Sequence, residues 1–178
     1  MKKSEIKALI SGVSPMRELC RVYFKYDRNY RYCFPISVGE RLFLAANEDD
    51  FIIDGFTVRR FADVKKVGIK NDKCIEIIKS EGILDKIEIP HIDVTDWHGV
   101  FDSLSKLGRN IIVERESLAE DESEFAVGKI IKVLKTKVLF KHFDSDGIWQ
   151  DEYYEIPYSQ ITSVTFSSRY VEVFSKYV

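Results

Sequence analysis

Two stretches, Asp63-Val-Lys-Lys-Val-Gly-Ile69 and Gln160-Ile-Thr-Ser-Val-Thr-Phe166, decide the fold that the sequence predicts. They align at a constant offset of 97 residues. The aligned apolar positions are Val64, Val67 and Ile69 in the first stretch and Ile161, Val164 and Phe166 in the second. After a slip of one residue, Cys74–Ile78 also aligns with Tyr170–Phe174. Repeated segments indicate one small fold used twice. We therefore expect the second half of the chain to be a diverged copy of the first.

The two copies share a predicted order of elements, in which a short helix precedes a series of strands. Ser4 is a suitable N-cap for a first helix over residues 4–12, which Gly12 and Pro15 end. Alternating apolar residues then predict strands at residues 20–26, 30–38, 41–46, 51–61, 63–69 and 73–79. We expect residues 1–80 to form the first unit and residues 81–94, with Pro90 extended, to form a linker.

Residues 95–178 form the second predicted unit. Its helix spans Trp97–Leu107, capped by Thr95 or Asp96 and ended by Gly108. Strands are predicted at residues 110–115, 125–134, 137–143, 152–158, 161–166 and 170–176. Residues 114–124 carry six acids against one arginine, so we expect a solvated loop in their middle.

This layout predicts the fold class. A short helix followed by about five bent antiparallel strands is the order of an Sm-like barrel, and both halves show it. We expect a mostly β protein with small helical content, built as two tandem five-stranded antiparallel barrels, each preceded by a short helix. Another small barrel of the SH3 type is the alternative fold.

The C-terminal residues carry a more specific resemblance. Gly128-Lys-Ile, Asp144-x-x-Gly147-x-Trp149, Ile161–Tyr170 and the ending Phe174-Ser-Lys-Tyr177 resemble a recurrent block in an uncharacterised family of small bacterial proteins with tandem Sm-like barrels. The block covers about the last 55 residues, and the first copy is less similar. The resemblance implies two barrels and a bacterial, cytoplasmic protein, and it carries over no catalytic residue.

Composition limits the function classes. The chain has 178 residues, a net charge of −2, nine Tyr and twelve Phe. An acidic balance argues against nucleic-acid binding by the whole surface, but it leaves room for a local basic patch. Three cysteines without CxxC spacing fit reduced thiols. The N-terminal residues lack the apolar run of a signal peptide, and no stretch approaches the ~20 apolar residues of a membrane span. We expect a cytoplasmic protein with no membrane partner.

Two segments are candidates for nucleic-acid binding. A predicted hairpin carries lysines and no acid between residues 128 and 141; the candidate residues are Lys129, Lys132, Lys135 and Lys137, with Lys141 beyond them. Lysines on the open face of a β ribbon can bind phosphates, although lysine also decorates solvent faces and protects strand edges. The aromatic and basic residues of 21–32 form the second candidate, where Arg21, Tyr23, Lys25 and Arg31 could bind backbone and stack bases. The alternative is that these aromatic residues form the core and rim of a barrel.

The last predicted strand of each copy is a candidate interface. Residues 74–78 and 170–174 are apolar on both faces of a strand, which an exposed edge rarely is. We expect barrel–barrel contacts, within or between chains, through Cys74, Glu76, Ile78, Tyr170, Glu172 and Phe174. The alternative is that each strand is covered by its own helix and linker.

Motifs for chemistry are absent from the sequence. Asp144-Ser-Asp-Gly147 lacks the ligand spacing of a calcium loop and predicts a turn. His91, His98 and His142 have no partner at metal-ligand spacing, and no nucleophile motif or phosphate loop occurs. We expect no cofactor and no metal. The predicted function is a non-catalytic binding or scaffolding module with a protein partner or self-association. Weak binding of single-stranded RNA is the alternative, and an unrecognised hydrolase is the third hypothesis.

Overall fold

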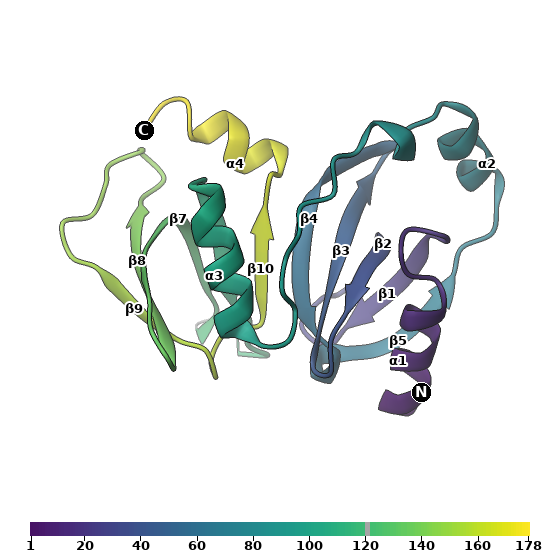
Figure 1. The fold of residues 1–178 in the computed structure, drawn as a ribbon, viewed down its shortest axis with the longest axis horizontal. Coiled ribbons are helices and arrows are strands. Elements are labelled where there is room, and N and C mark those ends of the chain that lie inside the picture. Colours follow the sequence, from purple (N-terminus) through teal and green to yellow (C-terminus); the bar gives the residue numbers. More distant parts are fainter. Residues whose placement is uncertain (120–121) are drawn as a thin grey trace.

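The structure, a computed structural model, describes residues 1–119 and 122–178 and contains one curved antiparallel sheet (Figure 1). Ten strands follow the order β5-β1-β2-β3-β4-β10-β6-β7-β8-β9. The chain is therefore mostly β, as the sequence predicts. Its strands form a single hydrogen-bonded array, in which residues 1–80 contribute one half and residues 95–178 the other.

The first half begins with a helix and five strands. Their bounds are α1 Lys3–Gly12, β1 Cys20–Phe24, β2 Tyr30–Val38, β3 Leu42–Asp49, β4 Ile52–Arg60, the 3-10 turn η1 Phe61–Asp63, and β5 Val64–Ile69. Helix α2, Lys73–Ser80, and a second 3-10 turn, η2 Leu84–Lys86, follow. The predicted first helix and the first five predicted strands of this half are all present, with their ends moved by a few residues.

The second half has the same order of elements. Its bounds are α3 Trp97–Leu107, β6 Ile111–Arg115, β7 Glu124–Val133, β8 Lys137–Phe143, β9 Tyr154–Pro157, β10 Ser163–Phe166 and α4 Arg169–Phe174. Asp96 caps α3 by accepting a hydrogen bond from the Gly99 amide at 2.9 Å, and Gly108 ends the helix with φ of 64°. The predicted loop within residues 114–124 connects β6 to β7, and its residues 120–121 lie outside the described residues.

The predicted strands at residues 73–79 and 170–176 are wrong, because both segments are helical. Asp72 caps α2 through the Cys74 amide, and Ile75 and Ile78 bury one face of it. Ser168 caps α4, whose buried residue is Val171. In runs this short, the same apolar residues fit both the alternation of a strand and the three-residue spacing of a helix face. The cap residues Asp72 and Ser168 favour the helix.

The two halves join through strands β4 and β10 rather than through separate closed barrels. Within each half the strands follow one order, with the last strand beside the first: β5-β1-β2-β3-β4 and β10-β6-β7-β8-β9. Among the described residues no ladder closes either half on itself, so the prediction of two closed five-stranded barrels is not what the structure shows. The shared order leaves the aligned segments of the sequence at corresponding positions, on β5 and β10.

Polar and aromatic pairs cross this junction. Phe56 and Phe166 lie opposite each other, with stacked rings 5.4 Å apart. The Thr57 hydroxyl lies 2.9 Å from that of Thr165. Beside the junction, Gly55 has φ of 70°, and a Cβ there would lie 2.5 Å from the Ser168 amide nitrogen, so only glycine lets the two halves approach this closely.

One core runs through both halves. The largest buried cluster joins residues of β2, β3 and β4 to residues of α3, β6, β8 and β10. A second cluster packs α1 onto β1, β3 and β5, and a small third cluster packs α4 onto β6, β7 and β8. The linker between the halves belongs to the main core, because Ile92 and Val94 are buried in it (Figure 1). A continuous core predicts that the halves unfold together.

Both outer edges of the sheet are protected. The Lys3 ammonium donates hydrogen bonds to the carbonyls of Phe61 and Val64 at 3.2 and 2.5 Å, beside the start of β5. At the other end, β9 has four residues and ends in Pro157. Short edges, proline and lysine all oppose the addition of another strand.

Candidate functional site

Strands β1, β2 and β5 place aromatic and basic side chains on one face of the sheet. Cys20, Val22 and Phe24 are buried against α1, so the residues between them face the opposite side. We name this surface the tyrosine–cation face; its residues are Arg21, Tyr23, Tyr30, Tyr32, Lys66 and Lys70. The ladder pairs Tyr23 with Tyr30 and Lys66, and pairs Arg21 with Tyr32 and Gly68.

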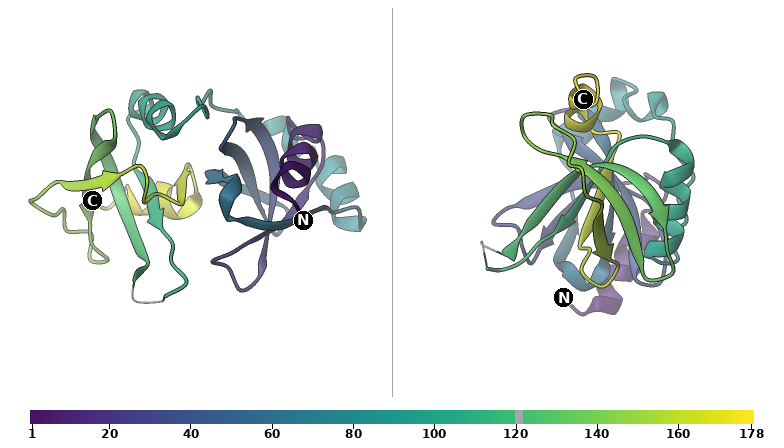
Figure 2. Two further views of the ribbon diagram at one scale, coloured as in Figure 1. Left: turned by 90° about the horizontal axis from the view of Figure 1, so that it is seen from below. Right: turned by 90° about the vertical axis from the view of Figure 1, so that its left-hand side faces the viewer.

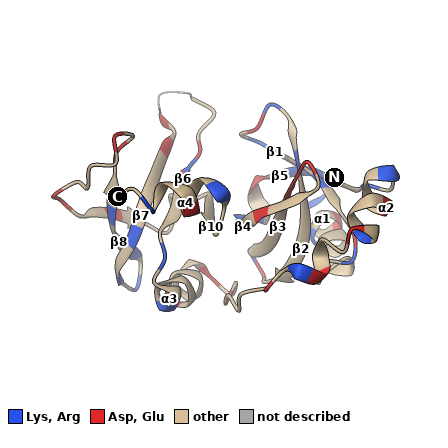
Figure 3. Cartoon of the chain, turned by 90° about the horizontal axis from the view of Figure 1, so that it is seen from above, with Lys and Arg blue, Asp and Glu red and all other residues tan. Residues whose placement is uncertain are grey.

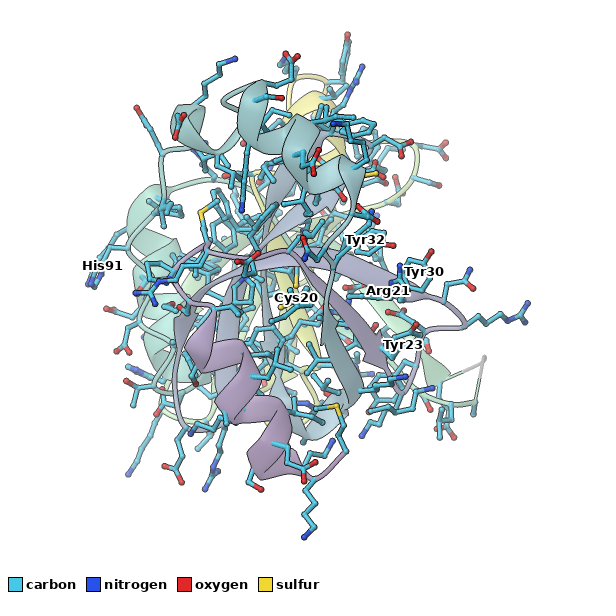
Figure 4. All side chains as sticks on the ribbon, turned by 90° about the vertical axis from the view of Figure 1, so that its right-hand side faces the viewer. Cys20, Arg21, Tyr23, Tyr30, Tyr32 and His91 are labelled. Carbon is cyan, nitrogen blue, oxygen red and sulfur yellow. The ribbon has the colours of Figure 1, made fainter. Side chains whose placement is uncertain are left out.

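The Tyr30 ring of this face contacts both other rings, and the Arg21 guanidinium lies over the rings of Tyr30 and Tyr32. The Tyr30 ring lies 5.7 Å from that of Tyr23 and 4.9 Å from that of Tyr32. Arg21 lies 4.7 Å from the Tyr30 ring and donates a hydrogen bond of 2.8 Å to the Tyr32 hydroxyl. Figure 4 shows these labelled side chains together on the side of the β1–β2 hairpin. The contacts restrict the rotamers of the rings, so the face is largely organised before any ligand arrives.

Two lysines border the rings, Lys66 on β5 and Lys70 directly after the end of that strand. The Lys66 ammonium lies 5.7 Å from the centre of the Tyr23 ring, and the Lys70 ammonium lies 4.1 Å from that of Tyr32. Gly68 lies between these lysines in the sequence and pairs with Arg21. A Cβ added at Gly68 would meet no atom within 4 Å, so the surface beside Arg21 is open. Tyr30 is 43% exposed. The face therefore combines accessible ring surface with cations at its margin.

Hydrogen bonds shift the pKa values of two residues of this face, Arg21 and Tyr32. The bond to Tyr32 raises the pKa of Arg21. Burial alone would raise the pKa of Tyr32, but hydrogen bonds from Tyr30 and Arg21 outweigh it and lower that pKa. Arg21 is therefore a permanent cation held against the rings.

Only two of the four predicted residues in this segment belong to the face. Arg21 and Tyr23 do, whereas Lys25 forms an ion pair of 2.8 Å with buried Asp63. Arg31 points to the other side of β2 and binds both carboxylate oxygens of Asp27, at 2.7 and 2.9 Å. The bond to Asp27, with Glu114 and Glu116 nearby, raises the pKa of Arg31. Carboxylates thus already neutralise these two cations.

Lys66 and Lys70 were not among the predicted site residues. The strand that contains Lys66 was predicted, but the position of both lysines beside the tyrosines depends on the register in which β5 pairs with β1. Lys65, Lys66 and Lys70 lie in one short segment of β5 and its end, which is a basic signal in the sequence. Its pairing with the tyrosines of β1 and β2 appears only in the folded sheet.

The predicted lysine hairpin does not form one patch. Lys129 lies 4.9 Å from the Trp149 ring, and Lys137 pairs with Glu155 at 2.5 Å. Lys132 is exposed on β7, while Lys135, in the turn before β8, lines a separate pocket beside α3. Figure 3 likewise shows basic and acidic residues interspersed along both halves. These lysines are dispersed, so the structure does not gather them at one phosphate-binding surface.

The six predicted interface residues lie on helices rather than on edge strands. On α2, Ile78 is buried on the inner face, Cys74 is half-buried, and Glu76 pairs with Lys73 on the surface. On α4, Phe174 packs on Phe143 within its own half, and Glu172 lies 3.4 Å from Arg109. Tyr170 is exposed beside Phe125. Contacts between the halves include the pairing of β4 with β10, the Arg59–Glu116 ion pair and the Arg169 amide, which donates to Asp54 at 2.5 Å.

Tyr170 also lines a groove between the two halves. The β1–β2 hairpin and the paired strands β6 and β7 project from the same side of the sheet (Figures 2 and 3). A cavity of about 540 Å³ lies between them, lined by Tyr30 and Tyr32 of the tyrosine–cation face as well as by Glu48, Asp49 and Asp54. Several of its carboxylates have internal partners: Glu48 accepts from the Phe51 amide and Asp54 from the Arg169 amide. This groove borders the tyrosine–cation face at Tyr30 and Tyr32, and its carboxylates disfavour an anionic ligand on that side of the rings.

The segment 144–147 forms a turn, as predicted. Asp144 accepts hydrogen bonds from the amides of Asp146 and Ile148, at 3.0 and 2.9 Å, and from the Gln150 side chain at 3.1 Å. Both of its carboxylate oxygens thus have partners. Within the described residues, no group of three or more His, Cys, Asp or Glu side chains is placed to hold a metal ion.

Cys20 and Cys33 lie opposite each other on β1 and β2, and both are buried, reduced thiols. Burial, with a smaller effect of Glu18, raises the pKa of Cys20 to about 12, and burial also raises the pKa of Cys33. A raised pKa keeps both as unreactive thiols at pH 8. We expect one of the three cysteines, half-buried Cys74, to react quickly with a disulfide reagent in the native protein, and all three to react in denaturant. Fast reaction of two or three native thiols would contradict this packing.

The described part of the chain has no helix with both the length and the apolar character needed to cross a bilayer. Comparisons with protein-family models, with curated proteins and with solved structures find no match to this chain. The tyrosine–cation face must therefore be interpreted from its own geometry.

Proposed function

We propose that the protein is a non-catalytic binding module whose tyrosine–cation face binds single-stranded nucleic acid. The observation that carries this proposal is the row of Tyr23, Tyr30 and Tyr32, in which Tyr30 contacts both other rings. Three cations, Arg21, Lys66 and Lys70, lie around this row. Bases stack on tyrosine whatever their identity, while cations beside the rings bind the phosphates. The rings and the cations lie on one surface, which the three adjacent strands β5, β1 and β2 form.

The cations of the face supply the electrostatic attraction. At a net charge of −2, and with an acidic groove beside Tyr30 and Tyr32, attraction of a polyanion depends on Arg21, Lys66 and Lys70. The three cations of the face, of which Lys70 also lies 3.6 Å from Asp72, and its three rings match a segment of about two or three nucleotides, the number that aromatic residues on a sheet surface commonly stack. Such a short footprint predicts weak binding.

The fold supports the same proposal less directly. We propose that each half derives from one Sm-like unit, as the repeat and the shared strand order suggest, and that the pairing of β4 with β10 fused the two copies into one sheet. Scaffolding by strand addition has less support, because Lys3 covers the start of β5 and Pro157 lies on β9. Bacterial origin and cytoplasmic location remain proposals from the sequence resemblance.

A filter-binding titration with a fifteen-nucleotide poly(U) RNA tests the function. We expect binding at 50 mM salt that falls roughly 20-fold at 200 mM salt, because about three phosphate contacts give a log–log slope near −2 for a single strand. Tyr23→Ala and Tyr30→Ala are each expected to weaken binding by roughly fivefold to 150-fold, since a stacked base contributes about 1–3 kcal/mol.

Matched variants separate this face from the rest of the surface. Tyr153→Ala removes a tyrosine that is 56% exposed in the other half, and a Lys135→Gln/Lys137→Gln double change removes two hairpin cations. Neither is expected to change the affinity by more than about twofold, apart from a small effect of net charge. No binding at 50 mM salt, or equal losses in the Tyr30 and Tyr153 variants, would overturn the proposal.

A further inference from the structure

A second cavity, of about 540 Å³, lies between the two halves beside the start of α3. The first half contributes Arg41, Leu42 and Phe61 to its lining, and the second half contributes Trp97, Lys135 and Tyr158. This volume falls within the range of small-molecule pockets, roughly 300–1,000 Å³. No residue of the tyrosine–cation face lines it, so it is independent of the function proposed above.

The floor of this pocket is apolar and rigid. Leu42 and Trp97 are buried, and the Tyr158 ring stacks on Phe101 at 5.7 Å with an angle of 13° between the planes. The Tyr158 hydroxyl donates a hydrogen bond of 2.8 Å to the Leu134 carbonyl. Burial, together with nearby Asp96, raises the pKa of Tyr158 to about 12, so the ring remains neutral. A flat apolar group can therefore pack here without meeting a charge on the floor.

The rim of the pocket is cationic. Arg41 and Lys135 are both exposed, and neither has an ion-pair partner among the described residues. Lys3 adds a third cation, whose hydrogen bonds go to backbone carbonyls rather than to a carboxylate. The two acids on the rim are Glu40 and Asp96, and the carboxylate of Asp96 caps α3 through the Gly99 amide. Three cations, Lys3, Arg41 and Lys135, and two acids thus border an apolar floor.

We propose that this pocket binds a small organic anion with a flat apolar body. The body packs on Trp97 and Tyr158, and an anionic group such as a phosphate, sulfonate or carboxylate lies between Arg41 and Lys135. Since these two cations belong to different halves of the chain, the ligand bridges the halves. Its binding then stabilises the folded protein in proportion to its concentration.

The anionic fluorophore 8-anilinonaphthalene-1-sulfonate is a suitable probe, with uncharged N-phenyl-1-naphthylamine as its matched control. We expect the anion to bind the native protein at one site, with energy transfer from tryptophan, because Trp97 lines the pocket. Arg41→Gln and Lys135→Gln should each weaken binding of the anion by roughly three- to tenfold, while binding of the uncharged probe changes by less than about twofold. Lys132→Gln, on the same hairpin but outside the pocket, should leave both unchanged.

Competition identifies the anionic group. Displacement of the fluorophore by 1-naphthyl phosphate or by 1-naphthoate supports the proposal, and the stronger competitor names the preferred group. Displacement by neither would overturn it. Equal binding of the charged and uncharged probes, or a loss in Lys132→Gln as large as in Lys135→Gln, would also overturn it. Retained binding of the uncharged probe shows that each variant is folded with its pocket intact.

Discussion

Replacing Phe166 with alanine is expected to lower the free energy of unfolding by about 3–5 kcal/mol, the usual cost of removing a fully buried phenylalanine. Phe166 is 2% exposed, and its ring stacks on Phe56 across the junction of β10 and β4. The substitution leaves a cavity where the two halves meet, so both halves lose stability together. Urea unfolding followed by circular dichroism measures the change.

Phe125→Ala is the matched control for this variant. Phe125 is 57% exposed and touches the Tyr170 ring at its edge. Its replacement is expected to cost about 0.5 kcal/mol or less, as exposed positions usually do. Equal losses in the two variants, or a Phe166→Ala protein in which one half unfolds while the other keeps its full stability, would contradict the continuous core.

The second large effect is expected at Arg59. Its side chain is 4% exposed, lies 4.4 Å from the centre of the Phe24 ring, and donates to both carboxylate oxygens of Glu116 at 3.0 and 2.8 Å. Arg59→Ala leaves a partly buried carboxylate without its partner across the halves. We expect a loss of about 3 kcal/mol, the lower end for a broken buried ion pair, because Glu116 keeps some contact with water.

Two further variants check the electrostatic origin of this loss. Arg59→Ala combined with Glu116→Gln should recover about 1 kcal/mol or more, since the unpaired carboxylate is then gone. Arg109→Ala breaks an exposed ion pair with Glu172 and should cost about 0.5 kcal/mol or less. If the double variant is as unstable as Arg59→Ala alone, packing on Phe24 rather than charge holds this arginine.

The sequence predicted those elements whose pattern is local. Helix α3 was predicted from a cap at Thr95 or Asp96, an apolar face and Gly108 at its end. The structure has the helix at the predicted residues, with Asp96 as the cap. The wrong predictions at α2 and α4 also have a local cause. A run of five residues such as Cys74–Ile78 fits both the two-residue period of a strand and the 3.6-residue period of a helix. Their caps, Asp72 and Ser168, were the deciding signal.

Closure of the sheet and composition of the site are not local properties. Whether β4 pairs back within its own half or with β10 depends on twist and on partners more than 100 residues away, such as Thr165 for Thr57. The tyrosine–cation face likewise needs the register of β5 on β1 to bring Lys66 to Tyr23. Lys25 and Arg31 were predicted as ligand-binding from their charge, yet Asp63 and Asp27 neutralise them in the fold.

The most direct test of the tyrosine–cation face is an amide NMR titration of the protein with a short single-stranded oligonucleotide. We expect the largest shift changes at Arg21, Tyr23, Tyr30, Tyr32 and Lys66, on the three adjacent strands β1, β2 and β5. Shift changes confined to residues 129–137, or no changes at millimolar oligonucleotide in low salt, would contradict this assignment of the binding surface.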